Sequence, residues 1–210
     1  MTSAILSDRG LLRREMRARR RVLGHAERTA AARRLAGALM RHPAYLRAWS
    51  FATYLANDGE LDPTWLVRRA WANGRHCYLP VLVERPEPML RFAPYTPGTR
   101  FRCNRFGIPE PDVPRRELLP ARALDLLLLP LVAFDDLGNR LGMGGGYFDR
   151  TLAYQLGRSW VRPRLLGVGY AFQQVPTLAA AAWDVPLHGI VTECGPVEIA
   201  RQPTCLEGEA

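Results

Sequence analysis

The most apolar run of the sequence, at residues 126–131, constrains the fold more than any other stretch. The run is short and is bounded by Asp125 and Pro130, which is typical of a strand buried on both faces. The chain then reaches a loop with four glycines within residues 142–146, and apolar residues recur at helical spacing over residues 147–156. We therefore predict a buried strand, a glycine loop and a helix, in that order.

The glycine loop is a candidate anion site. Glycines let backbone N–H groups approach an anion closely, and the first turn of a helix adds unpaired donors and a positive dipole end. The spacing is not Gly-x-Gly-x-x-Gly, since Tyr147 takes the place of the third glycine, and it lacks the Gly-Lys-Ser/Thr ending of a P-loop. The spacing alone therefore leaves a plain tight turn as an equal alternative.

The length and composition indicate one domain. With 210 residues and 48% apolar composition, the chain is long enough for one sizeable core and short for two. We expect a single domain over residues 1–210, with loosely ordered tails at residues 1–7 and 196–210. No stretch approaches the roughly 20 apolar residues of a membrane span, and the N-terminus does not resemble a signal peptide. We therefore expect a cytoplasmic protein that does not bind membranes.

The cysteines and the arginines exclude some classes of protein. The four cysteines are scattered without a Cys-x-x-Cys pair, so reduced thiols are expected: Cys77, Cys103, Cys194 and Cys205. The net charge of +9 arises entirely within residues 1–47, and every basic residue is arginine. The neutral remainder and the absence of an aromatic motif argue against a specific nucleic-acid-binding protein, although nonspecific attraction stays an alternative.

Residues 8–23 have an arginine-rich helical pattern. Arginines recur three or four residues apart along it: Arg9, Arg13, Arg17 and Arg20. Like charges at this spacing repel each other, and an anionic partner would relieve the repulsion. A solvated basic face is the simpler alternative.

The remaining pattern predicts the fold class. Strand signals at residues 49–55 and 76–83 enclose a short amphipathic helix at 65–73, and further strand signals occur at 89–95 and 164–172. This alternation favours a parallel sheet covered by helices on both faces. We predict an α/β three-layer sandwich with a mixed, mostly parallel sheet flanked by helices.

The residues around the glycine loop form a distinctive set: Phe134, Asp135, Gly138, Arg140, Leu141, Gly142, Gly144, Gly146, Tyr147, Asp149 and Arg150. Together they strongly resemble the signature of the 5-formyltetrahydrofolate cyclo-ligase family, also called methenyltetrahydrofolate synthetase. Residues 106–111, Phe-Gly-Ile-Pro-Glu-Pro, resemble a second motif of the same family. The resemblance extends from Arg9 to Glu193.

This resemblance implies a monomeric enzyme that converts 5-formyltetrahydrofolate to 5,10-methenyltetrahydrofolate, using ATP and Mg²⁺ and releasing ADP and phosphate. It implies that ATP is bound by Arg9, Arg13, Arg140, Leu141, Gly142, Met143, Gly144, Gly145, Gly146, Tyr147 and Phe148. Arg140 and Tyr147 would be catalytic, with Tyr147 orienting the formyl group or handling a proton. Arg9 stands where the family usually has lysine, which keeps the charge but changes its geometry.

The resemblance also implies a folate pocket, formed by Leu55, Glu60, Gly144, Gly145, Gly146 and Tyr147. A carboxylate such as Glu60 offers two acceptors side by side, which match the paired N–H donors of a 2-amino-4-oxo pterin ring. The alternative role for Glu60 is that of an acid at a helix N-terminus, since Asp62-Pro63 is typical of a helix start.

Asp149 and Asp184 would hold magnesium by the same resemblance, because carboxylates suit a hard octahedral ion shared with phosphate oxygens. Asp149 could instead pair with Arg150 or another arginine, and Asp184 could cap a turn. Three residues depart from the family pattern, in which tyrosine, histidine and aspartate are common: Phe148, Trp183 and His188. These departures leave open a relative that binds folate with weak or lost catalysis.

Overall fold

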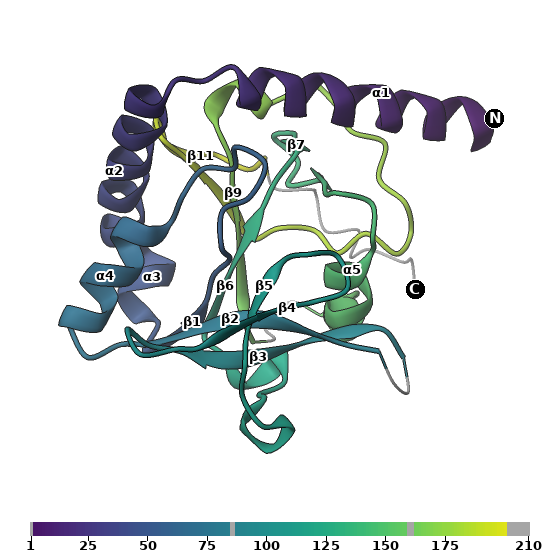
Figure 1. Ribbon diagram of the computed structural model, residues 1–210. Helices are drawn as coiled ribbons and strands as arrows, with labels where there is room; N and C mark the ends of the chain where they lie inside the picture. Colours follow the sequence, from purple (N-terminus) through teal and green to yellow (C-terminus); the bar gives the residue numbers. More distant parts are fainter. Residues whose placement is uncertain (1, 85–86, 159–161, 201–210) are drawn as a thin grey trace, which may run out of the picture.

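The computed structural model describes residues 2–84, 87–158 and 162–200, and one seven-stranded sheet runs through them (Figure 1). Its strands, in spatial order, are β11 (Gly195–Val197), β10 (Gly189–Thr192), β9 (Arg164–Val168), β6 (Leu126–Pro130), β1 (Ser50–Ala52), β2 (His76–Val83) and β3 (Met89–Tyr95). The five central strands are parallel, and the edge strands β3 and β11 are antiparallel to their neighbours.

Helices cover both faces of this sheet. On one face lie α2 (His25–Arg41), α3 (Pro43–Arg47) and α4 (Thr64–Ala72), and on the other lies α5 (Tyr147–Leu152). The long helix α1 (Thr2–Arg21) crosses one end of the sheet and contacts β7 (Ala133–Phe134). The predicted three-layer α/β fold with a mixed, mostly parallel sheet is confirmed.

The smaller elements lie in the connections. Two antiparallel pairs are formed by β4 (Phe101–Cys103) with β5 (Pro109–Pro111), and by β7 with β8 (Arg140–Leu141). Short 3₁₀ turns occur at Arg115–Glu117, Ala121–Ala123, Ala153–Gln155 and Ala171–Gln173. The β4–β5 hairpin contains residues 106–111, the segment that resembles a second family motif.

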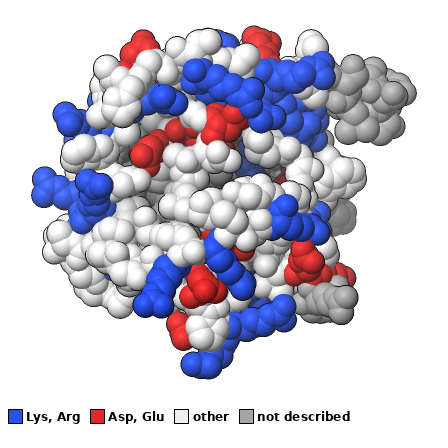
Figure 2. All heavy atoms as spheres, viewed as in Figure 1, with Lys and Arg blue, Asp and Glu red and all other residues white. Residues whose placement is uncertain are grey.

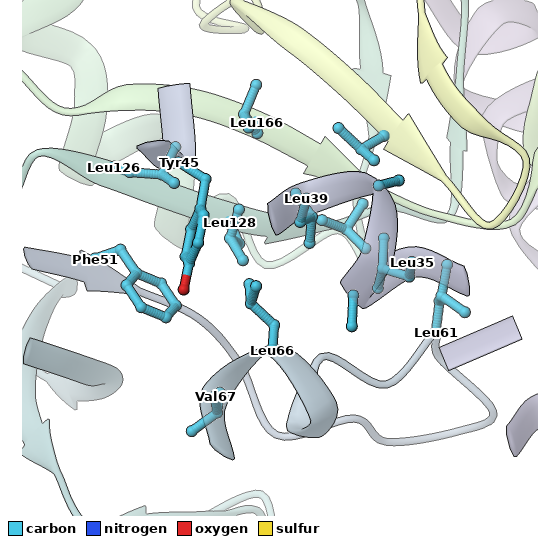
Figure 3. Close-up of a cluster of buried hydrophobic side chains, with 14 of the residues drawn as sticks. Leu35, Leu39, Tyr45, Phe51, Leu61, Leu66, Val67, Leu126, Leu128 and Leu166 are labelled. Atoms are coloured by element: carbon cyan, nitrogen blue, oxygen red, sulfur yellow. The ribbon is translucent and has the colours of Figure 1, made fainter. Parts of the chain in front are cut away.

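Strand β6 is buried on both faces, as its composition predicts. Leu126 and Leu128 belong to the cluster under α2, α3 and α4, whereas Leu127 and Leu129 belong to the cluster on the side of α5. Figure 3 shows the first cluster, in which Phe51 of β1 lies beside Leu126 and Leu128. Successive side chains of a strand point to opposite faces, so one run of leucines supplies both cores.

The strand order determines where a ligand can bind. Numbered along the chain, the five parallel strands lie in the order 2-1-3-4-5, so the connections run in opposite directions from β1 and β6. Open α/β sheets bind ligands at the carboxyl ends of the strands where the order reverses. The loop after β1 carries Glu60, and the segment after β6 leads to the glycine loop.

Several element boundaries differ from the expected ones. Helix α1 begins at Thr2, although residues 1–7 were expected to form a loose tail. A loose C-terminal tail was expected from residue 196, but the chain is still attached to the fold there. Pro196 and Val197 pair with β10, and the Ala200 N–H donates to Asp136 O at 2.8 Å. Residues 201–210 lie outside the described part of the chain.

The strand expected at 164–172 ends at Val168 because the Gln173 side chain turns the chain there. Gln173 Oε1 accepts from the Tyr170 N–H at 2.8 Å, and its Nε2 donates to Leu131 O and Val132 O.

Of the cysteines, the three that the structure describes are free thiols. No helix among the described residues has both the length and the apolar character required to cross a bilayer.

We predict that Gly167→Ala destabilises the fold. A Cβ atom at Gly167 of β9 would lie 2.5 Å from Leu187 Cδ1 and 2.7 Å from Leu131 Cδ1. Overpacking of this kind costs about 1–3 kcal/mol. Urea unfolding should show this loss, whereas the control Gly98→Ala, whose Cβ meets no atom within 4 Å, should be near neutral. Equal stability of the two variants would contradict this account of the core.

Candidate functional site

Three segments converge at the carboxyl ends of β1 and β6. Arg20 of α1 donates from Nη1 to Leu131 O, just beyond β6, at 3.3 Å. The same Nη1 lies 3.9 Å from Glu60 Oε1 in the loop after β1. Arginine atoms gather along the upper edge in Figure 2, where α1 lies, with carboxylate atoms directly beneath them. The structure thus brings the basic helix, the Glu60 loop and the end of β6 together.

The glycine loop lies beside the same helix. Arg13 Nε donates to Gly142 O at 2.8 Å, and an added Cβ at Gly144 would lie 3.6 Å from Arg13 Cζ. Burial lowers the pKa of Arg13, and the nearby positive charge of Arg9 lowers it further, while Asp184 acts in the opposite direction. Arg13 therefore lies against the glycine loop, and Arg9 lies close enough to Arg13 to affect its pKa.

The conformation of the loop requires glycine at several positions. Gly144 has φ +101° and Gly146 has φ +66°, a region that side chains rarely adopt. A Cβ at Gly145 would come within 2.9 Å of the Tyr147 ring. Gly142 and Gly145 are exposed, and the N–H groups of residues 143–146 donate no hydrogen bond to the described part of the chain. Such exposed, unpaired donors are what an anion would use.

Three other predicted loop residues have different environments. The Leu141 side chain is fully buried with the cluster under α1, so only its backbone can face a ligand. Met143 is 52% exposed. Phe148 is half-buried and packs against the core cluster on the side of α5, where a hydroxyl group has no evident role.

Two ion pairs lie side by side next to the loop. Arg9 Nη2 lies 3.0 Å from Asp184 Oδ2, and Arg140 Nη2 pairs with Asp149 Oδ1. Val185, adjacent to Asp184, joins the pairs, because its N–H donates to Asp149 Oδ1 at 3.3 Å and its carbonyl accepts from Arg140 Nη1. Asp149 therefore pairs with an arginine, which was its structural alternative to binding magnesium, and that arginine is Arg140.

Arg140 is almost completely buried, with 8% of its surface exposed. Burial lowers its pKa, while the negative charges of Asp149 and Asp184 raise it. The guanidinium is thus an oriented cation between two carboxylates. A phosphate group beside it would find a donor that is already fixed in position.

The two aspartates can be tested as a magnesium site. Asp149 Oδ2 and Asp184 Oδ1 accept no hydrogen bond from the described residues. No group of three or more His, Cys, Asp or Glu residues suited to a metal occurs in the described chain. Two carboxylates could hold an octahedral ion only if phosphate and water supplied its other oxygens. The structural alternatives are also present, since Asp184 Oδ2 accepts from the Ala181 N–H at 2.9 Å.

Tyr147 is held by a residue that the sequence did not single out. Arg105, in the turn between β4 and β5, donates from Nη2 to the Tyr147 hydroxyl oxygen at 2.8 Å. The Phe106 ring meets the Tyr147 ring edge-on with centroids 6.4 Å apart, and the Arg150 guanidinium lies 4.8 Å from the centroid of that ring. The only sequence signal for Arg105 is its position next to the motif at residues 106–111.

Glu60 is not the cap of α4. The carboxylate that binds a backbone N–H at the start of α4 is that of Asp62, whose Oδ1 accepts from the Thr64 N–H at 2.8 Å, next to Pro63 at the N-cap position. Glu60 Oε2 instead accepts from the Asn57 N–H at 3.1 Å. Burial raises the pKa of Glu60, while the Asn57 N–H and the Arg20 charge act to lower it. Leu55 is half-buried in the same loop.

Two of the three departures from the family pattern can be placed in relation to the site. Trp183 is 69% exposed and precedes Asp184. His188 lies at the amino end of β10, whereas the glycine loop follows the carboxyl end of β6, so the two are at opposite ends of the parallel strands. Its Nδ1 accepts from the Leu165 N–H at 2.9 Å, and burial, together with the charge of Arg164, lowers its pKa to about 4. His188 therefore has a structural role away from the site.

The predicted residues do not line either of two surface depressions found in the described chain. One, of about 500 Å³, includes His42, Arg164 and His188, and the other, of about 360 Å³, lies around Asp136 and Gln174. The candidate site is accordingly an open surface between α1, the Glu60 loop and the glycine loop.

We predict that Arg140→Met lowers the free energy of unfolding by about 1–3 kcal/mol, because it leaves the Asp149 carboxylate and the Val185 carbonyl without their donor. In an Asp149→Asn background the same change should cost less, since no carboxylate is left unpaired. Urea unfolding of the four proteins measures this coupling. Additive effects would show that the pair is not coupled.

Comparison with known proteins places the chain in a family. The sequence profile of the 5-formyltetrahydrofolate cyclo-ligase family matches residues 5–193. The 5-formyltetrahydrofolate cyclo-ligase of Escherichia coli (strain K12) is 40% identical over 179 residues, covering 84% of this chain and 96% of its own. The cyclo-ligase of Haemophilus influenzae is 42% identical over 145 residues, covering 69% and 76%.

A solved structure agrees with these sequence matches. The NMR structure of Aquifex aeolicus 5,10-methenyltetrahydrofolate synthetase matches this fold with a TM-score of 0.76 and 29% identity, covering 95% of this chain and 96% of the other. The profile match covers the glycine loop, the Glu60 loop and both ion pairs, which lie between Arg9 and Asp184. This chain therefore belongs to the 5-formyltetrahydrofolate cyclo-ligase family.

Proposed function

We propose that this protein catalyses the ATP-dependent cyclisation of 5-formyltetrahydrofolate to 5,10-methenyltetrahydrofolate, with release of ADP and phosphate. Membership of the family supports this reaction, and one structural observation supports assigning it to the residues around the glycine loop. A basic helix, an exposed glycine loop and a largely buried carboxylate, Glu60, converge beyond the carboxyl ends of β1 and β6. A triphosphate and a pterin could therefore be bound next to each other there. The reaction uses ATP, which fits the expected cytoplasmic location.

The phosphate end of ATP is assigned to the basic residues and the loop. Arg13 already lies on the loop, Arg140 pairs with Asp149 of the helix that follows the loop, and Arg9 pairs with Asp184. The exposed N–H groups of Gly144 and Gly145 complete a positive surface on which a triphosphate can lie. We further propose contacts to ATP from Leu141, Gly142, Met143, Gly146, Tyr147 and Phe148.

The pterin end of the folate is assigned to the loop after β1. Glu60 would accept two hydrogen bonds from the pterin N–H groups, and Leu55 would contact the ring. We further propose that the formyl end of the substrate lies against the other predicted folate contacts: Gly144, Gly145, Gly146 and Tyr147. This arrangement supports transfer of phosphate directly between the two substrates.

The reaction needs ATP because the formyl group is an amide, whose oxygen is a poor leaving group. Transfer of the γ-phosphoryl group to that oxygen releases ADP and makes a good leaving group. N10 of the folate then attacks the formyl carbon, loses its proton and displaces phosphate as the C–O bond breaks. Arg140, Arg13 and the loop N–H groups would stabilise the transferring charge mainly by position.

Tyr147 is our candidate for orienting the formyl group or receiving the proton, because Arg105 fixes its hydroxyl oxygen at 2.8 Å. Tyr147 and Phe148 both pack in part against the core cluster on the side of α5, and of the two only Tyr147 carries a hydroxyl group.

We also propose Asp149 and Asp184 as the residues that hold Mg²⁺. When bound, the ion would supply positive charge to the phosphate oxygens. Arg9 and Arg140 keep these carboxylates in place in its absence. We expect the protein to act as a monomer.

The proposed function predicts formation of the methenyl product. With ATP, Mg²⁺ and 5-formyltetrahydrofolate, the wild-type protein should generate its absorbance. Gly144→Ala should lower kcat/KM at least about tenfold, because a side chain at φ +101° costs one or more kcal/mol and shifts the loop. The control Gly98→Ala should keep wild-type turnover. No product from the wild type would reject the proposed function, and full turnover by Gly144→Ala would reject the loop assignment.

A second prediction concerns the pterin. Glu60→Gln replaces one carboxylate acceptor with a donor, so affinity for 5-formyltetrahydrofolate should fall at least about tenfold, while ATP affinity stays unchanged. Isothermal titration calorimetry with each ligand separately measures both values. Unchanged folate affinity would remove Glu60 from the pocket.

A further inference from the structure

Arg20 lies between the two halves of the proposed site. It is completely buried, with 0% of its surface exposed, although it belongs to a helix whose other arginines are at least partly exposed. A buried guanidinium is costly unless its donors are paired. Its environment therefore indicates a specific role.

The contacts of Arg20 reach three segments. Nη1 donates to Leu131 O at 3.3 Å and lies 3.9 Å from Glu60 Oε1, while Nη2 donates to Asp58 Oδ2 at 3.2 Å. The backbone also approaches closely, since a Cβ at Gly59 would lie 3.1 Å from Arg20 O. The one helix residue thus touches the Glu60 loop on both sides of Gly59.

The charged and titratable groups that act most strongly on Glu60 come from α1 and from its own loop. Arg20 and Arg17 from α1 bring positive charge, and Asp58 from the same loop brings negative charge. Tyr54 also faces Glu60, but burial raises the pKa of its hydroxyl well above the usual value, so it is neutral. Its hydroxyl donates to Leu61 O at 2.5 Å. Of these cations, Arg20 alone forms an ion pair with Glu60.

We propose that Arg20 is a positioning residue that keeps Glu60 ionised and in place for the pterin, and that it ties this pocket to the helix that carries Arg9 and Arg13. The inference rests on the proposed folate role of Glu60.

The need for such a cation follows from burial. Glu60 is already largely removed from water, which raises its pKa, and a pterin ring over it would remove more water. A protonated carboxyl group can no longer accept two hydrogen bonds. A fixed positive charge opposes protonation without competing for the ligand, because Arg20 approaches Glu60 from the buried side.

The test is the pH dependence of 5-formyltetrahydrofolate affinity, measured by calorimetry without ATP. Wild-type affinity should fall as the pH is lowered through the pKa of Glu60. In Arg20→Met the midpoint of this fall should move upward by about one pH unit or more, because the opposing charge is lost. Arg20→Lys, which keeps the charge, should restore a midpoint close to that of the wild type.

Asp58→Asn is the matched control for loss of helix docking. It removes the carboxylate that binds Arg17, Arg20 and Arg21, but it keeps the cation beside Glu60. Since the charge of Asp58 raises the pKa of Glu60, its removal should move the midpoint downward. An upward shift in Asp58→Asn, or an unchanged midpoint in folded Arg20→Met, would overturn the proposal.

Glu60→Gln separates this inference from the proposed function. Loss of the acidic fall in Glu60→Gln, together with an unchanged midpoint in Arg20→Met, would reject the role of Arg20 alone. A wild-type pH profile in Glu60→Gln would reject the folate role of Glu60 and the inference with it. If Arg20→Met does not fold, the proposal is tested by carbon-13 NMR titration of the Glu60 carboxyl group in the wild type and in Asp58→Asn. A midpoint that is not lower in Asp58→Asn overturns the proposal.

Discussion

The attachment of α1 to the loop after β1 is the interaction on which the rest of the site depends. One carboxylate, Asp58, binds three arginines of the helix, with distances of 2.5 Å to Arg17 Nε, 3.2 Å to Arg20 Nη2 and 2.5 Å to Arg21 Nε. Charges of one sign repel along an isolated helix, and this carboxylate offsets the repulsion. The far end of the helix then carries Arg9 and Arg13 to the glycine loop.

The parallel sheet supplies the rigid part of the site. Because β1 and β6 are adjacent and their connections diverge, two loops from distant parts of the chain emerge at the same edge. Buried polar contacts, such as those of Gln173 with Leu131 O and Val132 O, hold the chain where it leaves β6. The flexible glycine loop therefore starts from a fixed position, which favours binding of a ligand in one orientation.

The sequence predicted those parts of the fold that depend on local pattern. Composition and periodicity are enough to predict the leucine strand at residues 126–131, the strands at 76–83 and 89–95 and the glycine loop. The partners in ion pairs between distant residues could not be predicted. For Asp149 the sequence offered Arg150 or another arginine as the alternative to magnesium, and only the fold identifies Arg140. The contact of Arg105 with Tyr147 could not be predicted either, because it depends on how the β4–β5 hairpin packs against the glycine loop.

The backbone at positions 58 and 59 has a consequence for how such a chain can vary. Asp58 has φ +50° and Gly59 has φ +74°, and Gly59 lies against the carbonyl of Arg20. A larger residue at position 59 would push the helix away, and a smaller one at position 20 would leave a hollow under the turn. The nearest atoms to a Cβ at position 59 are the backbone O and C atoms of Arg20, which every residue has, so no substitution at position 20 makes room for a side chain there. Glycine at position 59 is therefore expected to be retained in evolution.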